Sequence, residues 1–449
     1  MAEKQFSTDK NYNAESRAIE QKIVISFEGM DPVSLYRSDY LVSTSILEEA
    51  HSQSTTTPFG GITSNEIDVE LLNENGIFTP SNQNSPYYGK MKRGVKLEPF
   101  IRPMEDENGE YEWDPLGVYY VTDWSATVTG MLATVTANDK LYDIFTDNVP
   151  DYKIHMNLPV KDFYQDIFDL IGIEGTIDTT LNKIIEFAYI NSAPKALFSE
   201  LGLAFMTDCF CKHDGSIHVR NLQNNANIRA TITDSNQIID AEITQSIAQS
   251  YDGVSITCNH LQESSIQEIK SYTKLDIAKG LTKAAKIQFS ASNPVFRLMY
   301  AKITGAPKSV VKIDNLYPTN ISYSIDNPEA EASECELKFY GTYLETNKED
   351  LSTTGDNLVK VDNLYLQNNE DTISLRQHIL AYLFNWLPLL KLTVRGNPKL
   401  ELGDTIQAIS ERYNLNYTGV LIKQTFDYSS SGLTGTMLLL NTDILKEVK

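Results

Sequence analysis

The feature that most constrains the fold of this chain is an internal repeat, which links a stretch near residue 117 to the C-terminal end. The early copy comprises residues 117–124, 130–135 and 138–141. The late copy comprises residues 419–426, 432, 435–439 and 441–445. Each copy reads as a strand, a Gly-containing turn and a second strand that ends in a polar cap, which indicates a duplicated β unit. Two amphipathic hairpins can also resemble one another by chance, and the sequence leaves that alternative open.

Length and composition place the chain among multidomain globular proteins. Its 449 residues are enough for about three or four domains, and a hydrophobic share of 41% supplies ordinary cores. The polar N-terminus predicts no secretion signal, and no apolar run reaches the ~20 residues that span a bilayer. We therefore expect a chain made in a cytoplasm, with no membrane span and with four free thiols.

The charge balance limits the partners. The formal net charge of −22 argues against stable nucleic-acid binding, because phosphate recognition needs a Lys/Arg surface. An acidic surface would repel DNA, which suits a channel through which DNA must slide. The alternative is that the charge serves solubility alone.

The distribution of strand and helix patterns predicts an α+β fold that is mainly β. Short alternating strands with regular turn signals predict closed or nearly closed β architecture at both ends of the chain. Apolar spacing predicts helices after Pro159, over 181–190, over 196–203 and over 372–386. The expected segments are an arm (1–20), a β-barrel domain (21–145), a mixed helix/hairpin domain (146–222), a mainly β middle domain (223–345) and a second β-barrel with a helix (346–449).

A hairpin over 204–221 carries the strongest candidate for a site. Cys209, Cys211 and His213 alternate on one face of a strand. A two-residue Asp-Gly turn at 214–215 would pair His213 with Ser216 and Cys211 with His218, which gathers four zinc-type ligands. However, residues two apart on a flat strand diverge by ~6–7 Å, whereas tetrahedral ligands converge on one ion. We therefore expect buried thiols, with no metal and no cofactor.

Other candidate residues favour no enzyme chemistry. The sequence has neither a G-x-S-x-G elbow nor an H-E-x-x-H motif. The isolated histidines are His51, His155, His260 and His378, the last on the polar side of the 372–386 helix. The acidic pairs 48–49 and 105–106 read as solvated surface, and Gly60-Gly61 opens no phosphate-binding helix. We therefore expect no catalytic residue and no enzyme activity.

Aromatic residues in loops are candidates for binding surfaces. The chain holds 24 tyrosines, and Tyr87-Tyr88 and the Tyr111-to-Trp113 stretch lie in turn-rich segments. Sugar contact, subunit contact and ordinary half-buried strand positions all fit such residues, and we favour the last two.

Several of these segments together resemble bacteriophage tail hub proteins. The matching stretches are 71–82 with its Asn-Gly turn, 85–88 with a Ser-Pro loop, 93–96 with a Gly-Val strand start, 117–124 ending in Trp124, and 139–141 as a cap. Residues 397–404 resemble the second barrel of that family. The resemblance covers about 20–145 and 370–449, and the middle of the chain agrees in length and order.

The resemblance implies a structural baseplate or tail-tip hub of a phage or phage-derived particle. Such a hub is a homotrimer with two tube-like β-barrels per chain, whose six units join a six-fold tail tube, or a distal tail protein, to a three-fold central spike or fibre. The duplication fits this independently, and a closed ring would satisfy sheet edges. The implied location is the virion tail, assembled in the host bacterial cytoplasm. The alternatives are a tail-associated cell-wall hydrolase and a carbohydrate-binding tail-tip protein.

Overall fold

The computed structural model confirms the mainly β, α+β fold class. It describes residues 12, 18–50, 57, 59–104, 112–127, 131–144, 150–224, 227–242, 251–283, 287–289, 294–306, 308–328 and 332–446. His51, Glu105, Asp106 and Tyr111, named above as candidates, lie outside these residues. None of the helices formed by the described residues is long and apolar enough to cross a membrane.

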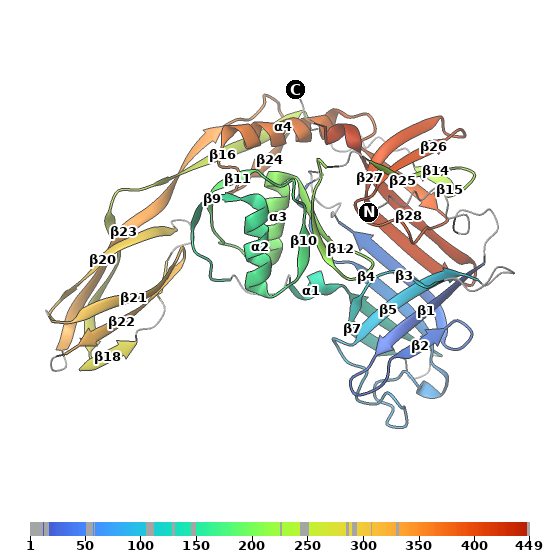
Figure 1. Cartoon of the computed structure of the whole chain (residues 1–449), viewed down its shortest axis with the longest axis horizontal. Helices are drawn as coiled ribbons and strands as arrows, with labels where there is room; N and C mark the ends of the chain where they lie inside the picture. The colour runs from blue at the N-terminus through green and yellow to red at the C-terminus, as the bar shows by residue number, and fades with distance from the viewer. Residues whose placement is uncertain are drawn as a thin grey trace.

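Strands from both ends of the chain form one 14-stranded sheet (Figure 1). Its N-terminal strands are β1 (Ile19–Ser26), β2 (Val33–Tyr36), β3 (Leu41–Glu49), β4 (Glu66–Leu72), β5 (Lys96–Pro103), β6 (Asp114–Pro115), β7 (Tyr119–Ala126) and β8 (Leu132–Asn138). Its other strands are β14 (Ile228–Thr233), β15 (Ile238–Glu242), β25 (Leu389–Val394), β26 (Thr405–Ser410), β27 (Leu415–Ser429) and β28 (Gly432–Asn441). We call β1–β8 the first unit and the remaining six strands the second unit.

The repeat found in the sequence is part of a larger duplication. Both copies are hairpins, β7–β8 and β27–β28, and each has a bulge in its first strand, after Val121 and after Leu421. Their neighbours also correspond, because the pairings β3-β4-β8-β7-β5 in the first unit match β15-β25-β28-β27-β26 in the second. The strands follow one another in the same chain order in both units. Chance resemblance of two hairpins does not produce five matching strands.

Backbone hydrogen bonds repeat at the same places in the two units. In each unit a glycine with positive φ, Gly94 (84°) or Gly403 (93°), precedes β5 or β26. Each glycine donates its N–H to the carbonyl just before the bulge, at Val121 or Leu421, over 2.8 Å in both cases. The bulges also correct the sequence alignment by two residues, so that Trp124 corresponds to Gln424 rather than to Phe426.

One long strand joins the two units into a continuous sheet. The first part of β27 pairs with β26, and its second part, from Lys423 to Tyr428, pairs antiparallel with β3 from Glu49 to Thr44. Each unit folds around a separate apolar core, one centred on residues such as Ile23, Val69 and Val135, and the other on Leu392, Ile406 and Leu439. We call the β27–β3 pairing the seam.

A helical module lies beside the two units, on the side of the arm (Figure 1). It contains α1 (Lys140–Ile144), β9 (His155–Pro159), α2 (Val160–Ile171), β10 (Gly175–Ile177), β11 (Ile184–Ala188), α3 (Pro194–Phe205), β12 (Thr207–Cys211) and β13 (Ile217–Asn221). The helices expected after Pro159 and over 196–203 are confirmed as α2 and α3. The helix expected over 181–190 is wrong, because β-branched Ile184 and Ile185 lie in a strand that pairs with β9 and buries alternate residues.

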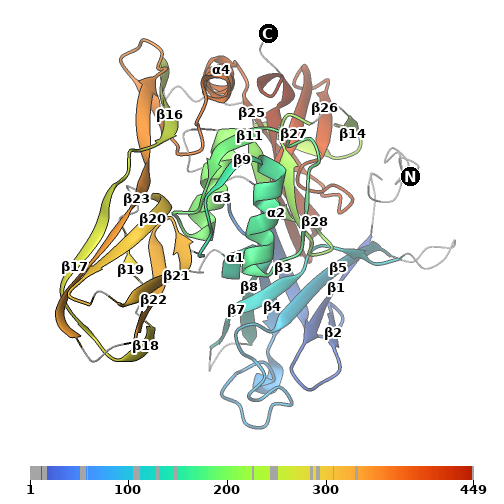
Figure 2. The same ribbon diagram turned by 60° about the vertical axis from the view of Figure 1, so that its left-hand side comes forward.

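The remaining strands form an arm that projects from the body of the molecule (Figures 1 and 2). They are β16 (Gly253–Glu263), β17 (Gln267–Ile277), β18 (Gly280–Lys283), β19 (Ile287–Gln288), β20 (Val295–Thr304), β21 (Val310–Tyr317), β22 (Asn320–Asn327), β23 (Ala332–Asp350) and β24 (Leu358–Asp362). Helix α4 (Asn369–Phe384), capped by the Asn368 side chain, confirms the helix expected over 372–386. It packs against β16.

Strand pairing differs from the expected domain limits at two places. Strands β14 and β15 pair with β26 and β25 in the second unit, although the sequence placed them in a middle domain starting at 223. The end of β23 and all of β24 pair with β16, although the sequence placed them after 345. Both differences arise because the arm is inserted in the chain between β15 and β25. Strands that pair in the sheet are therefore far apart in the sequence, and local patterns do not show that they pair.

The module docks on the first unit through a glycine. Gly60 has φ of +77°, Ser199 Oγ donates a hydrogen bond to its carbonyl, and a Cβ there would lie 2.7 Å from Cβ of Leu203 on α3. Gly89 has a similar φ of +72°, but a Cβ there would meet nothing within 4 Å.

We predict that Gly60→Ala destabilises the protein more than Gly89→Ala. Both variants place a side chain at positive φ, which costs about 1 kcal/mol. Only Gly60→Ala also forces α3 away from the loop, and overpacking of this kind costs about 1–3 kcal/mol more. Chemical denaturation of the two variants side by side measures the difference. Equal destabilisation would contradict this packing.

Candidate functional site

The candidate hairpin forms between β12 and β13, but its turn is longer than expected. Lys212 donates its backbone N–H to Ser216, and Asp214 accepts from the backbone N–H of Ser216, so the connection spans 212–216. Cys211 therefore pairs with Ile217, and His218 pairs with Phe210. The expected pairing of Cys211 with His218 is wrong by one residue, and such a slip moves a side chain to the other face.

The four zinc-type side chains consequently do not gather. Cys209 and Cys211 are buried in the apolar core of the helical module, where burial raises the pKa of both thiols. The ring of His218 stacks on Phe210, with centroids 6.3 Å apart, on the opposite face. Among the described residues, no group of three or more His, Cys, Asp and Glu side chains is arranged to hold a metal ion.

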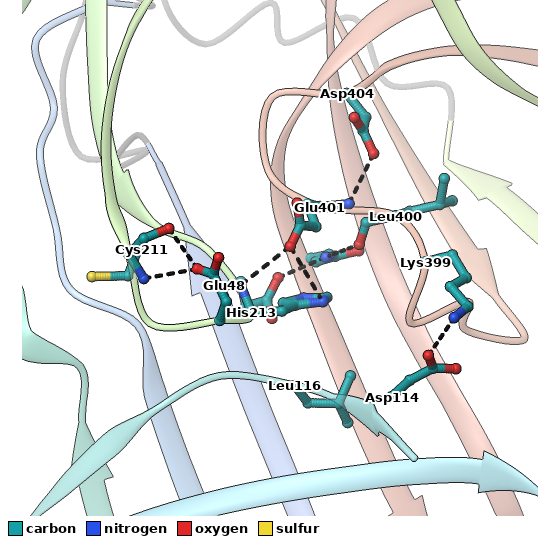
Figure 3. Close-up of polar contacts among 12 residues, drawn as sticks. Glu48, Asp114, Leu116, Cys211, His213, Lys399, Leu400, Glu401 and Asp404 are labelled. Carbon is teal, nitrogen blue, oxygen red and sulfur yellow. Dashed lines mark hydrogen bonds and ion pairs between the residues drawn. The ribbon is translucent and has the colours of Figure 1, made fainter. Parts of the chain in front are cut away.

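His213 instead belongs to a polar cluster with Glu48, Glu401 and Gln424, which is buried apart from the partly exposed Glu401 and which we call the polar junction. Figure 3 shows His213, Glu48 and Glu401 of this cluster. Nε2 of His213 lies 2.7 Å from Oε1 of Glu48, and the two side chains are 7% and 2% exposed. At this distance the contact is an ion pair when the imidazole ring is protonated. The backbone N–H of His213 donates to Oε1 of Glu401 over 3.2 Å.

The junction connects three parts of the chain. Glu48 comes from β3 of the first unit, His213 from the hairpin turn of the module, and Glu401 from the loop before β26. Gln424, on β27, donates from Nε2 to Glu48 (2.6 Å) and to the Leu400 carbonyl (2.9 Å). Glu48 thus contacts both the module and the second unit from one position at the seam.

Electrostatics at the junction favour the charged form of His213. Burial alone would lower its pKa, but the negative charge and proximity of Glu48, with Glu401 and Asp404 nearby, raise the pKa to about 9. Next to this pair, burial raises the pKa of Asp139 to about 7, against hydrogen bonds from the backbone of Asn65 and Leu141.

A cleft of about 320 Å³ opens beside the junction, between the hairpin and residues 401–404. Charged groups of both signs line it, and Arg220 spans it by donating to Asp208 (2.7 Å) and to the Gly403 carbonyl. The guanidinium also lies 5.8 Å from the centre of the Phe210 ring. The contact of Arg220 with Gly403 holds the module against the second unit.

Two sequence interpretations are corrected by burial. Glu48 and Glu49 are 2% and 9% exposed rather than solvated, and Glu49 pairs with Lys423 at 3.0 Å across the seam. His378 is buried rather than on a polar helix face, with Nδ1 2.7 Å from the Ser374 carbonyl. The sequence signal that was available for Glu48 is its place in an alternating strand, where the apolar neighbours Ile46 and Ala50 are buried.

The remaining candidates are dispersed. The His155 ring packs against that of Tyr152 in a tilted arrangement, with centroids 5.0 Å apart, and His260 pairs with Glu349 at 3.1 Å on the arm. Tyr87 is buried and stacks with Phe27 and Phe78, whereas Tyr88 is 48% exposed. Trp113 receives cation–π contacts from Lys22 and Arg102, each 4.5 Å from the ring centre.

Comparison with known proteins identifies the fold. No protein-family model and no curated protein sequence matches the chain. A solved 43 kDa tail protein of prophage MuSo2 from Shewanella oneidensis is similar over 95% of this chain and 100% of its own, with 12% identity and a TM-score of 0.53. A tail protein from Neisseria meningitidis MC58 is similar over 95% and 98%, with 10% identity and a TM-score of 0.52. The chain therefore has the fold of phage tail proteins.

We predict that stability decreases as pH rises from 6.5 to 9. The folded-state pKa of His213 lies above its ordinary value of 6.5, so its stabilising contribution is complete below pH 6.5 and lost as pH rises through about 9. Asp139 acts in the same direction, because its folded-state pKa of about 7 lies above its ordinary value. Loss of its proton in the folded state therefore lowers stability as the pH rises through about 7. The loss is of the order of 3 kcal/mol, measurable as a decrease in the denaturation midpoint.

Glu48→Gln is the matched control. It removes the charge that raises the pKa of His213, so the midpoint should be lower at pH 6.5 and should change less between pH 6.5 and 9. Loss of one partner of a buried pair costs about 3–5 kcal/mol. A wild-type midpoint that stays constant over this range would refute the ion pair.

Proposed function

We propose that this chain is a structural, non-enzymatic hub at the end of a phage tail or of a phage-derived particle. In this proposal three copies form a ring of six similar units, which contacts a six-fold tail tube or a distal tail protein. The observation that carries the proposal is the duplicated five-stranded unit joined in one continuous sheet. The shared fold with tail proteins supports the same role.

The two units are similar in their strands but differ in their insertions, which suits an adaptor between two symmetries. In the first unit the connection between β3 and β4 covers residues 50–65, whereas the corresponding connection in the second unit covers 243–388 and holds the arm and α4. A ring of three chains would therefore present six similar sheets and three arms. The sheets fit a six-fold partner, and the arms fit a three-fold spike or fibre.

Charge and the polar junction fit a passive role. The net charge of −22 would keep DNA from adhering to a channel, in line with the expected lack of stable nucleic-acid binding. The His213–Glu48 pair is buried and bridges elements, so it supports a fixed geometry rather than turnover. A hydrolase that used the Cys/His hairpin would need Cys211 and His218 on one face, and their strand register separates them. We place the protein in the virion tail, after assembly in the host bacterial cytoplasm.

We predict a homotrimer whose class averages along the symmetry axis show six similar lobes and an open centre. Light scattering at high protein concentration measures the mass, and electron microscopy gives the averages. A chain that stays monomeric, both alone and mixed with tail-tube protein, would overturn the hub proposal. A ring with another number of chains would overturn the six-to-three adaptation.

A further inference from the structure

Among the described residues, the second half of strand β7 in the first unit is paired on one edge only. Strand β7 pairs with β8 along its length, but β5 reaches only Tyr119 and Tyr120 on the other side. The corresponding strand of the second unit, β27, also pairs with its β5 equivalent, β26, through its first part only. In β27 the remaining part is covered by β3. Residues 122–126 of β7 are the matching part.

A second strand lacks the partner that its equivalent has. Strand β3 lies between β4 and β27, whereas β15, its equivalent, pairs with β25 and ends the described path of the sheet. The equivalence is well defined, because Leu41 in β3 and Ile238 in β15 each precede a bulge of the same kind. Ile239, at the β15 bulge, is 41% exposed.

We propose that β7 of one chain pairs antiparallel with β15 of the next chain and so repeats the seam between subunits. The proposal rests on the ring proposed above and specifies its contact. Each chain contributes one seam internally, β27 with β3, and one externally, β7 with β15. Three chains then alternate three internal and three external seams, and the ring closes with these strand edges covered.

The equivalences give the register of the external seam. Counted from the bulges of β27 and β7, Asp427 and Thr127 occupy the same position, four residues after Lys423 and Asp123. Counted from the bulges of β3 and β15, Ser45 and Glu242 occupy the same position, two residues after Ser43 and Asp240. The internal pair Asp427–Ser45 therefore corresponds to an external pair between Thr127 of one chain and Glu242 of the next.

Side-chain chemistry agrees with this register. In the internal seam the Ser45 hydroxyl donates to the Asp427 carboxylate over 2.6 Å. In the external seam the hydroxyl and the carboxylate would exchange sides, with Thr127 as donor and Glu242, which also pairs with Lys391 over 2.9 Å within its own chain, as acceptor. Both residues are exposed in the single chain, so a partner can reach them without unfolding either unit.

Disulfide trapping of the full-length chain tests the seam. Opposed residues of antiparallel strands have Cα atoms about 4.5–5.5 Å apart, which a disulfide can span. The double variant Thr127→Cys/Glu242→Cys should lose its monomer band on oxidation and gain a species of three times the chain mass on non-reducing gels. The four native cysteines are buried, which keeps background cross-linking low.

Two variants are matched controls. Ser45→Cys/Asp427→Cys should form a disulfide within one chain, which shows that the seam geometry permits cross-linking and adds no intermolecular species. Ser125→Cys/Glu242→Cys is two residues out of register and should cross-link far less than the in-register pair. Equal cross-linking by both intermolecular pairs would overturn the register.

The outcomes separate the seam from the hub itself. Light scattering of the reduced double variant reports the oligomer independently of the disulfide. A trimer that forms the internal but not the external disulfide overturns the seam and leaves the hub proposal standing. A monomer under all conditions overturns both, and covalent chains longer than three overturn ring closure.

Discussion

The pairing of β27 with β3 is the constraint on which the rest of the structure depends. Strand pairing by itself tolerates slippage, because backbone groups are alike along an edge. Side chains fix the register here: Gln424 lies opposite Glu48, and Lys423 lies opposite Glu49. A slip would leave the buried Glu48 carboxylate without its hydrogen bond from Gln424, and losing a hydrogen bond to a buried charged group costs about 1–3 kcal/mol. The internal seam therefore has one favourable register.

The same buried carboxylate positions the helical module. His213 reaches Glu48 from the hairpin turn, so docking of the module and closure of the seam satisfy one charge together. The apolar contacts follow the same plan. Leu141 and Ile144 of α1 and Ile444 and Leu445 at the end of the second hairpin enter one core with α2 and α3. The caps of both repeat copies thus join the core around α2 and α3, which ties these helices to the two units in related ways.

Local patterns in the sequence were sufficient where neighbouring residues decide the structure. The repeat, α2 and α4 were predicted from turn chemistry and apolar spacing, and all three are present. The five-strand duplication was not predictable in this way, because the arm separates β15 from β25 in the chain. The hairpin register failed by one residue, since an Asp-Gly pair does not by itself reveal a turn that extends to Lys212 and Ser216.

The candidate site was the least accessible part from sequence. Glutamates are mostly exposed in folded proteins, so the sequence predicts that Glu48 and Glu49 lie at the surface. In the structure, contacts with distant parts of the chain bury both side chains. Their partners His213, Gln424 and Lys423 lie far away in the chain, so local sequence carries no sign of compensation. Only the alternation around Ile46 indicated that position 48 faces inward.

The two kinds of seam differ in a way that suits stepwise assembly. Within a chain, Gln424 and Lys423 engage buried carboxylates. At the matching positions of β7 stand Trp124, whose indole N–H already donates to the Phe78 carbonyl over 3.0 Å, and the exposed Asp123. The external seam proposed above would thus lack these two contacts to buried carboxylates, which would make it the weaker of the two. Each chain would complete its internal seam during folding and then join its neighbours through edges that stay hydrated until they meet.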